Sequence, residues 1–97
     1  MSLSFEWDDR KAQGNLRKHG ISFEEASTIF GDSFAQTIHD PLHSVNEDRY
    51  VELGESCKRR ILVVVFTDRE SKIRLVSARM ANRRERKDYE EGCKGTA

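Results

Sequence analysis

The strongest limit on the fold comes from segment 60–67, R-I-L-V-V-V-F-T, which is apolar at six consecutive positions, Ile61 to Phe66. A strand that is apolar on both faces is buried on both, so this segment predicts the central strand of a sheet. Its apolar run is strand-sized and far shorter than a membrane-spanning helix requires. The sequence of 97 residues therefore predicts a single domain built around this strand, with no membrane segment.

Strand-like and helical spacings predict the elements on either side of the central strand. Alternating apolar residues predict further strands at 4–8, 34–39, 49–53 and 72–79. Apolar residues at helical spacing predict helices at 10–19 and 22–31, and a third helix follows the last strand to residue 91. We expect the core to span about residues 4–91 and residues 92–97 to form a frayed tail.

These elements predict an α+β fold in the order β-α-α-β-β-β-β-α. Short connections between consecutive strands favour a small antiparallel sheet, with helices on one face and the other face free to bind a ligand. Two helix starts have the pattern of a capping box, Ser22 with Glu25 and Asn82 with Glu85. Gly20 is placed to end the first helix in a left-handed conformation.

Charge is distributed unevenly, although the net charge is zero. Residues 56–87 hold 11 Lys and Arg against 3 Asp and Glu, whereas residues 1–55 hold 5 against 11. Four cations fall in the first turn and a half of the third predicted helix, where the helix dipole disfavours them: Arg83, Arg84, Arg86 and Lys87. An anion such as a nucleic-acid phosphate would balance them, and a merely solvated charged face is the simpler alternative.

Two long motifs near the ends of the chain resemble one protein family. The first is F-E-W-D-x-x-K-x-x-x-N-L-R-K-H-G-I-S-F-E-E-A at Phe5–Ala26, and the second is S-A-R-x-A-x-R-R-E-R-x-x-Y at Ser77–Tyr89. Together with Arg49-Tyr50 and L-V-V-V at Leu62–Val65, they resemble the BrnT family, the toxins of bacterial type II toxin–antitoxin modules. The likeness covers about residues 5–90, although Met80 stands where the family often has Lys.

The resemblance implies both a fold and a function. It implies a RelE-like fold, ribonuclease activity that halts translation, and a cytoplasmic location without a cofactor. It also implies an antitoxin partner of the BrnA type, with a ribbon-helix-helix part, in a complex that binds its own promoter DNA. Cys57 and Cys93 fit this setting as free thiols, and no His, Cys or carboxylate set has the spacing of metal ligands.

RNA can be cleaved without a metal when its 2′-hydroxyl attacks the neighbouring phosphorus. The enzyme then needs a base for the hydroxyl, cations for the charge that develops on the phosphate, and an acid for the leaving oxygen. The candidate catalytic residues are Arg79, His19, Arg83, Glu85 and Arg49. For Arg79 the alternative is a structural salt bridge, for Glu85 a capping role, and for His19 a contact with the helix dipole.

The candidate substrate-binding residues lie on the first and third predicted helices. They are Lys11, Asn15, Lys18, Arg84, Arg86 and Tyr89. Ion pairs of Arg84 with Asp88 and of Arg86 with Glu90 are the alternatives for the two arginines, and core packing is the favoured role of Tyr89. The first helix and Arg49 are expected to form the wall of an RNA cleft that faces the third helix.

Two other functions remain open from the sequence. The chain could be a non-catalytic module that binds nucleic acid or an antitoxin, which the scarcity of bases and Met80 favour. A weaker alternative is an interaction domain whose basic helix docks an acidic peptide.

Overall fold

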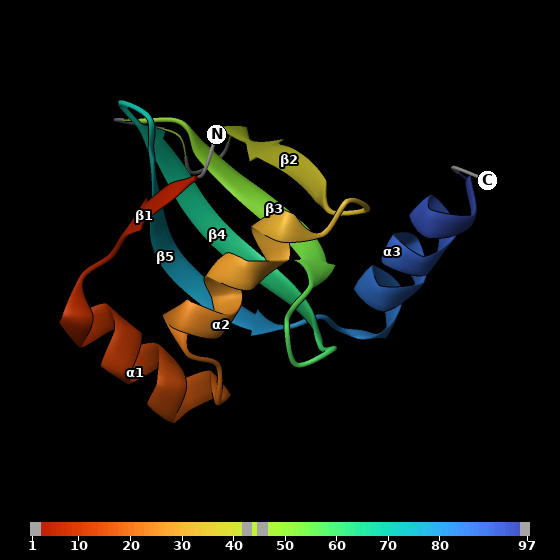
Figure 1. The fold of residues 1–97 in the computed structure, drawn as a ribbon, viewed down its shortest axis with the longest axis horizontal. Coiled ribbons are helices and arrows are strands. Elements are labelled where there is room, and N and C mark those ends of the chain that lie inside the picture. The colour runs from red at the N-terminus through yellow and green to blue at the C-terminus, as the bar shows by residue number, and fades with distance from the viewer. Residues whose placement is uncertain (1–2, 42–43, 45–46, 96–97) are drawn as a thin grey trace.

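A computed structural model describes residues 3–41, 44 and 47–95 and shows one five-stranded sheet with helices on both sides (Figure 1). The strands are β1 (Ser4–Glu6), β2 (Gln36–Asp40), β3 (Arg49–Glu55), β4 (Ile61–Arg69) and β5 (Lys72–Met80). The helices are α1 (Asp9–His19), α2 (Phe23–Ser27), its short 3-10 continuation η1 (Thr28–Gly31), and α3 (Arg83–Gly95). The α+β class and the predicted order are therefore confirmed, with η1 completing the second predicted helix.

The sheet has the order β1-β5-β4-β3-β2, so the apolar segment forms the central strand as predicted. Strands β2 to β5 form the predicted antiparallel meander. β1 departs from it, because it pairs in parallel with the first residues of β5. No hairpin joins β1 to β5, since the chain leaves β1 through α1 and α2 and rejoins the sheet at its opposite edge as β2.

α1, α2 and η1 cover one face of the sheet, which we call the helix face. Its buried core holds side chains from the helices, the α1–α2 connection and the strands: Ile21, Phe23, Ala26, Ile29, Leu62, Val64, Phe66, Leu75 and Ala78. The ring of Phe30 packs edge-on against Phe66, with ring centroids 5.0 Å apart. A Cβ at Gly54 would lie 3.2 Å from the Cβ of Ile29, so glycine lets η1 approach β3 closely.

Asn15 fixes α1 to the edge of β5. Its side-chain nitrogen donates to the carbonyl oxygens of Ala78 (2.8 Å) and Ile21 (2.9 Å), and its side-chain oxygen accepts from the Ala78 N–H (3.0 Å). β1 pairs only with Lys72–Arg74, so the Asn15 amide replaces a neighbouring strand further along β5. Gly20 ends α1 with φ of 72°, the left-handed conformation that the sequence predicts.

α3 packs on the opposite face of the sheet, where no helix was predicted. Its Tyr89 is 6% exposed and forms a second apolar cluster with Leu53 and Val63. α3 continues to Gly95, past the point at which the sequence predicts the tail to begin, and residues 96–97 lie outside the described ranges. A Cβ at Gly92 would overlap the Gln36 side chain, so tight packing on β2 keeps this part of α3 in place.

Part of the connection between β2 and β3 lies outside the described residues. Among those that are described, the Ser44 hydroxyl donates to the Asp40 carbonyl oxygen (2.5 Å) and accepts from the Arg49 N–H (2.9 Å). Of the helices described, none has both the length and the apolar character needed to cross a bilayer.

Candidate functional site

The strand register places three rows of side chains on the sheet face opposite α1 and α2, which we call the open face. The first row is Asp40, Arg49, Thr67, Arg74 and Glu6; the second is Ile38, Val51, Val65 and Ser77; the third is Gln36, Leu53, Val63 and Arg79. Side chains alternate between the two faces of a strand, so Leu62 and Val64 point to the helix face while Val63 and Val65 point to this one. The open face thus carries a charged row with two arginines and two carboxylates, a mainly apolar row and a mixed row.

α3 crosses the strands over the third row. Residues spaced by about one helical turn contact it in order: Glu85 binds Arg79, Tyr89 packs on Leu53 and Val63, and Gly92 lies against Gln36. The Gln36 side chain also donates to the carbonyl oxygen of Asp88 (3.2 Å). No other described helix packs on the open face, so its first and second rows are available to a ligand beside α3.

Arg79 and Glu85 form a two-pronged ion pair where β5 passes into α3. The Arg79 Nη1 and Nη2 atoms lie 2.8 and 2.9 Å from the two carboxylate oxygens of Glu85. The Arg79 guanidinium, followed by the Asn82 N–H, holds the pKa of Glu85 below its ordinary value against the effect of burial. The same ion pair raises the pKa of Arg79. The salt bridge considered for Arg79 is therefore present, and it joins two predicted catalytic residues.

The helix cap that involves Glu85 is complete. The Glu85 N–H donates to the Asn82 side chain (2.8 Å), and the Glu85 carboxylate accepts from the Asn82 N–H (2.8 Å), as predicted for a capping box. The Ser22 box is half-made, because the Glu25 N–H donates to Ser22 (3.0 Å) while the Glu25 carboxylate binds Arg60 instead. Glu85 therefore serves as a cap and as the partner of Arg79 at once.

The remaining predicted residues of α3 divide into exposed cations and one anchor. Arg83, Arg84 and Arg86 are exposed, and none of them forms an ion pair with a residue in the described ranges. The expected pairs with Asp88 and Glu90 are thus absent there, which leaves these charges free for an anionic ligand. Tyr89 is buried, as the packing alternative predicted.

The Tyr89 hydroxyl donates to Asp32 (2.5 Å) and ties α3 to the segment after η1. Burial, followed by the hydrogen bond to Asp32, raises the pKa of Tyr89. Burial opposes ionisation of Asp32 as well, but hydrogen bonds from Tyr89 and from the N–H groups of Glu55 and Phe34 outweigh it and lower the pKa of Asp32. This contact positions the helix rather than presenting the ring to a substrate.

The structure does not bring the predicted residues of α1 next to those of α3. Figure 1 shows α1 and α3 at opposite ends of the molecule. Lys11, Lys18 and His19 are exposed on α1, which packs on the helix face and on the edge of β5. Asn15 is only 8% exposed, and its amide is engaged within the fold. The expected cleft between the first and third helices is therefore not formed, because α1 and α3 lie on different faces of the sheet.

Arg49 does lie on the open face, in the row farthest from Arg79. On β4, Arg49 pairs with Thr67 and Arg79 pairs with Val63, four positions away. Arg49 therefore lies about 13 Å from Arg79 along the strands and two strands across. Arg49 makes no ion pair with another residue of the described chain. The open face thus unites Arg49, Arg79 and Glu85 from the predicted catalytic set.

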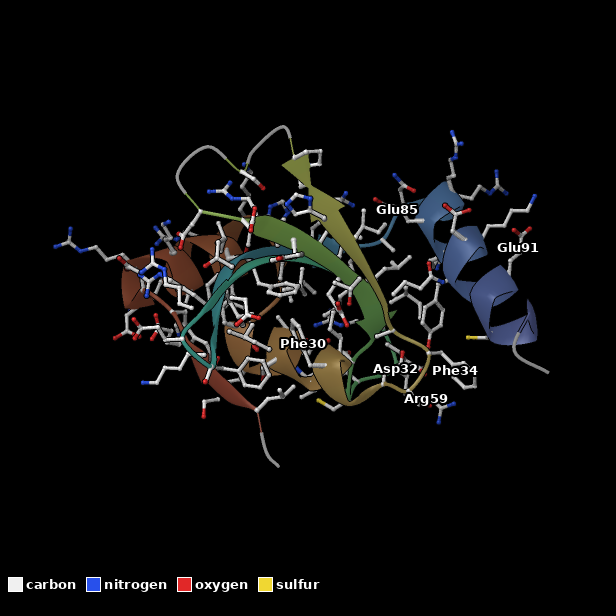
Figure 2. All side chains as sticks on the ribbon, turned by 90° about the horizontal axis from the view of Figure 1, so that it is seen from above. Phe30, Asp32, Phe34, Arg59, Glu85 and Glu91 are labelled. Carbon is white, nitrogen blue, oxygen red and sulfur yellow. The ribbon has the colours of Figure 1, made fainter. Side chains whose placement is uncertain are left out.

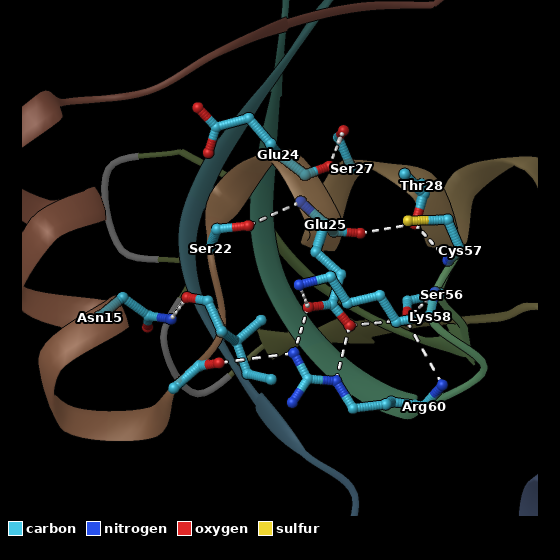
Figure 3. Close-up of polar contacts among 12 residues, drawn as sticks. Asn15, Ser22, Glu24, Glu25, Ser27, Thr28, Ser56, Cys57, Lys58 and Arg60 are labelled. Atoms are coloured by element: carbon cyan, nitrogen blue, oxygen red, sulfur yellow. Dashed lines mark hydrogen bonds and ion pairs between the residues drawn. The ribbon is translucent and has the colours of Figure 1, made fainter.

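A polar network under α2 was not predicted from the sequence. The carboxylate of Glu25 accepts hydrogen bonds from Arg60 Nε (2.9 Å), from Arg60 Nη2 and from the Ser56 hydroxyl (2.7 Å), and Lys58 lies 4.0 Å away (Figure 3). Hydrogen bonding to Arg60 lowers the pKa of Glu25 against the effect of burial. The side chain of Glu25 is 2% exposed, so this network holds α2 to the β3–β4 turn and is not a ligand site.

No cluster of three or more His, Cys, Asp or Glu side chains with the arrangement of metal ligands occurs within residues 3–41, 44 and 47–95. Cys57 and Cys93 do not form a disulfide, as expected.

Comparisons with known proteins bear on the family and on the fold. A family model described as "Ribonuclease toxin, BrnT, of type II toxin-antitoxin system" matches residues 7–85. Among solved structures, the chain is similar to the ribonuclease toxin BrnT of Brucella abortus, with a TM-score of 0.66 and 24% sequence identity. That alignment covers 84% of this chain and 100% of the Brucella chain, and it shows a shared fold. None of the curated protein sequences compared with the chain matches it.

Proposed function

The chain belongs to the BrnT family of ribonuclease toxins of type II toxin–antitoxin systems, and we propose that it cleaves RNA on its open face. The observation that carries this proposal is the paired Arg79 and Glu85 at the edge of that face. An arginine fork matches two phosphate oxygens as well as it matches a carboxylate. A phosphate of the RNA can therefore take the place that Glu85 now occupies.

This exchange supplies two catalytic groups in one step. Once the phosphate binds Arg79, the Glu85 carboxylate loses the contact that lowers its pKa and becomes a stronger base beside the substrate. Glu85 then takes the proton of the 2′-hydroxyl, the 2′-oxygen bonds to phosphorus, and the bond to the 5′-oxygen breaks. The products are a 2′,3′-cyclic phosphate and a 5′-hydroxyl whose proton comes from solvent.

The charge that develops on the phosphate is stabilised by cations of the chain. Arg79 contacts the phosphate directly, and Arg83, the first residue of α3, adds a second positive charge close by. This route needs no metal ion. Arg49, Arg84 and Arg86 contribute salt-dependent contacts to the RNA backbone. His19 and the other α1 residues lie outside this proposed site.

The toxin's partner follows from the same family membership. A type II toxin is held by an antitoxin, and we propose one of the BrnA type with a ribbon-helix-helix part, in a complex that binds its own promoter DNA. Release from it in the cytoplasm would let the toxin cleave RNA and stop translation. Co-expression tests the pairing: growth should stop with the toxin alone and recover with its antitoxin.

Purified protein and a 5′-labelled RNA test the enzymatic proposal. Wild type should give products with a cyclic phosphate in the presence of EDTA, whereas Arg79→Ala should lose cleavage. Arg17→Ala is the matched control, because it removes an exposed arginine of α1. Intact RNA with wild-type protein, or equal cleavage by Arg79→Ala, would refute the proposal.

A second candidate is a non-catalytic module that binds RNA through the open face. The exposed cations of α3 that form no ion pair favour binding as such. Salt-sensitive RNA binding without any cyclic-phosphate product would establish this alternative.

A further inference from the structure

One carboxylate, Glu47, is bound by Arg69 at the end of the open face remote from α3. Arg69 holds Glu47 with two hydrogen bonds, from Nε (2.7 Å) and Nη2 (2.8 Å). The hydrogen bond to Arg69 is the main cause of the lowered pKa of Glu47, and the positive charges of Arg74 and Arg49 add to it. Arg69 therefore binds Glu47 directly, while Arg49 and Arg74 act on it only through their charge.

Thr67 lies between two of these arginines in the sheet. The register pairs Thr67 with Arg49 on one side and with Arg74 on the other. Its residue is 1% exposed, and its side-chain hydroxyl is buried without a hydrogen-bond partner among the described residues. Buried hydroxyl groups normally have a partner, so this donor is available to one.

Arg49 and Arg74 differ in whether they already form an ion pair within the protein. Arg74 Nη1 lies 3.1 Å from a Glu6 carboxylate oxygen, whereas Arg49 has no ion-pair partner in the part of the chain that the structure describes. Both side chains are half-buried. A ligand with strong acceptor oxygens would gain the Arg49 fork, the charge of Arg74 and the hydroxyl of Thr67 together.

We propose that Arg49, Thr67 and Arg74 form a second phosphate subsite, which holds another phosphodiester of the RNA strand cleaved at Arg79. The proposal rests on the proposed function and extends it to the length of the substrate. In the free protein Glu47, which Arg69 binds, competes with this phosphate through its charge, whereas Glu85 competes at Arg79 by direct contact. RNA displaces Glu85 when it binds.

The separation of the two subsites sets the shortest RNA that uses both. Four residues of β4 at ~3.3 Å each put them about 13 Å apart along the strands, too far for one phosphate to contact both. The apolar row of Ile38, Val51 and Val65 lies between them. It offers a surface for sugars and bases without reading their sequence. A dinucleotide therefore reaches only one subsite, and a longer strand reaches both.

Binding of a non-cleavable RNA, with 2′-deoxyribose at each site of attack, tests the subsite without cleavage. Arg49→Ala should weaken binding of a long oligonucleotide about tenfold, as expected for lost hydrogen bonds to a charged group. It should lower the salt dependence of binding by about one phosphate contact. Selectivity for the long oligonucleotide over a dinucleotide should fall, whereas Arg17→Ala should leave selectivity unchanged. Equal effects of the two variants would overturn the proposal.

Thr67→Val separates a ligand contact from a structural role. The substitution removes an unpartnered buried hydroxyl at nearly constant shape, so the Tm of the free protein should stay or rise. Binding of the long oligonucleotide should nevertheless weaken. Glu47→Gln should strengthen it, because it removes the competing carboxylate. Unchanged binding by both variants would refute the subsite.

The failure of this inference can be told from failure of the proposed function. If wild type cleaves RNA but length selectivity does not depend on Arg49 and Thr67, the subsite is wrong and the function stands. If wild type cleaves no RNA but binds long oligonucleotides through these residues, the subsite stands and the catalytic proposal is wrong.

Discussion

Replacement of Arg60 by Ala should destabilise the protein severely without touching the open face. Glu25 has a side chain that is 2% exposed, and Arg60 supplies two of its hydrogen bonds (Figure 3). Breaking a buried ion pair by removing one partner costs about 3–5 kcal/mol, because a buried charge is left uncompensated. Arg60 itself is 33% exposed, and Ser56 and Lys58 remain near the carboxylate. We therefore expect about 3 kcal/mol, at the lower end of that range.

The loss should appear as a lower Tm and as a lower midpoint of urea unfolding. For a domain of this size, about 3 kcal/mol corresponds to a fall in Tm of roughly 12–24 °C. Arg59→Ala is the matched control. The Arg59 side chain is 88% exposed, and its one ion pair, with Glu55 at 3.7 Å, lies at the surface. That variant should stay within about 0.5 kcal/mol of wild type.

The pH dependence gives this prediction a second test. The pKa of Glu25 is lower in the folded protein than its ordinary value of 4.5, so the stabilisation is present above that value. It is lost as the pH falls through the folded pKa, because protonated Glu25 has no charge for Arg60 to compensate. The gap between wild type and Arg60→Ala should therefore shrink in acid. A loss below about 1 kcal/mol, or a gap that does not change with pH, would refute the reasoning.

Three further variants probe other parts of the molecule. Glu85→Gln should raise the affinity for non-cleavable RNA several-fold, because Arg79 is released, yet abolish cleavage; equal affinity would argue against internal competition. Glu52 is buried and its pKa is raised, chiefly by burial, so its charge lowers stability as the pH rises through its ordinary value. Glu52→Gln should therefore raise the Tm at neutral pH more than in acid, and a Tm that fell at neutral pH would contradict this. Tyr89→Phe removes a hydrogen bond to ionised Asp32 and should cost about 1.5–3 kcal/mol, with faster hydrogen exchange in α3; unchanged exchange there would mean that this contact does not hold the helix.

Local patterns made the fold predictable to a large extent. The apolar segment became β4 because strand burial depends on composition, and the Asn82–Glu85 cap and Gly20 rest on contacts between close neighbours. The half-made Ser22 box shows the limit of such patterns. The carboxylate of Glu25 prefers Arg60, which is 35 residues away and has no local signature.

The candidate site was less predictable, because it depends on which face each element occupies. Helical spacing groups Asn15 with the cations of α1, but its amide pairs with Ala78, 63 residues along the chain. Tyr89 packs α3 on the face of the sheet opposite α1. The expected RNA cleft between the first and third helices therefore does not form. Arg74 and Thr67 were missed because each is an ordinary strand residue, and only the register brings them beside Arg49. Alternation along β4 could have placed Thr67 on the face of Val63 and Val65. It could not have placed Arg74 on the face of Arg79, because the register shifts at Val65–Phe66.

The zero net charge can be reconciled with an RNA substrate through the two internal carboxylates. Glu47 binds Arg69 and Glu85 binds Arg79, at opposite ends of the open face (Figure 2 labels Glu85). In the free protein these carboxylates neutralise part of the positive charge of that face. Because the two sites lie about 13 Å apart along the strands, their effects should be independent. The double variant Glu47→Gln with Glu85→Gln should therefore bind long non-cleavable RNA with the product of the two single gains, whereas a dinucleotide should show one gain at most. A double variant no better than Glu85→Gln alone would mean that RNA reaches only the α3 end of the open face, and that Glu47 is a structural partner of Arg69 rather than a competitor of phosphate.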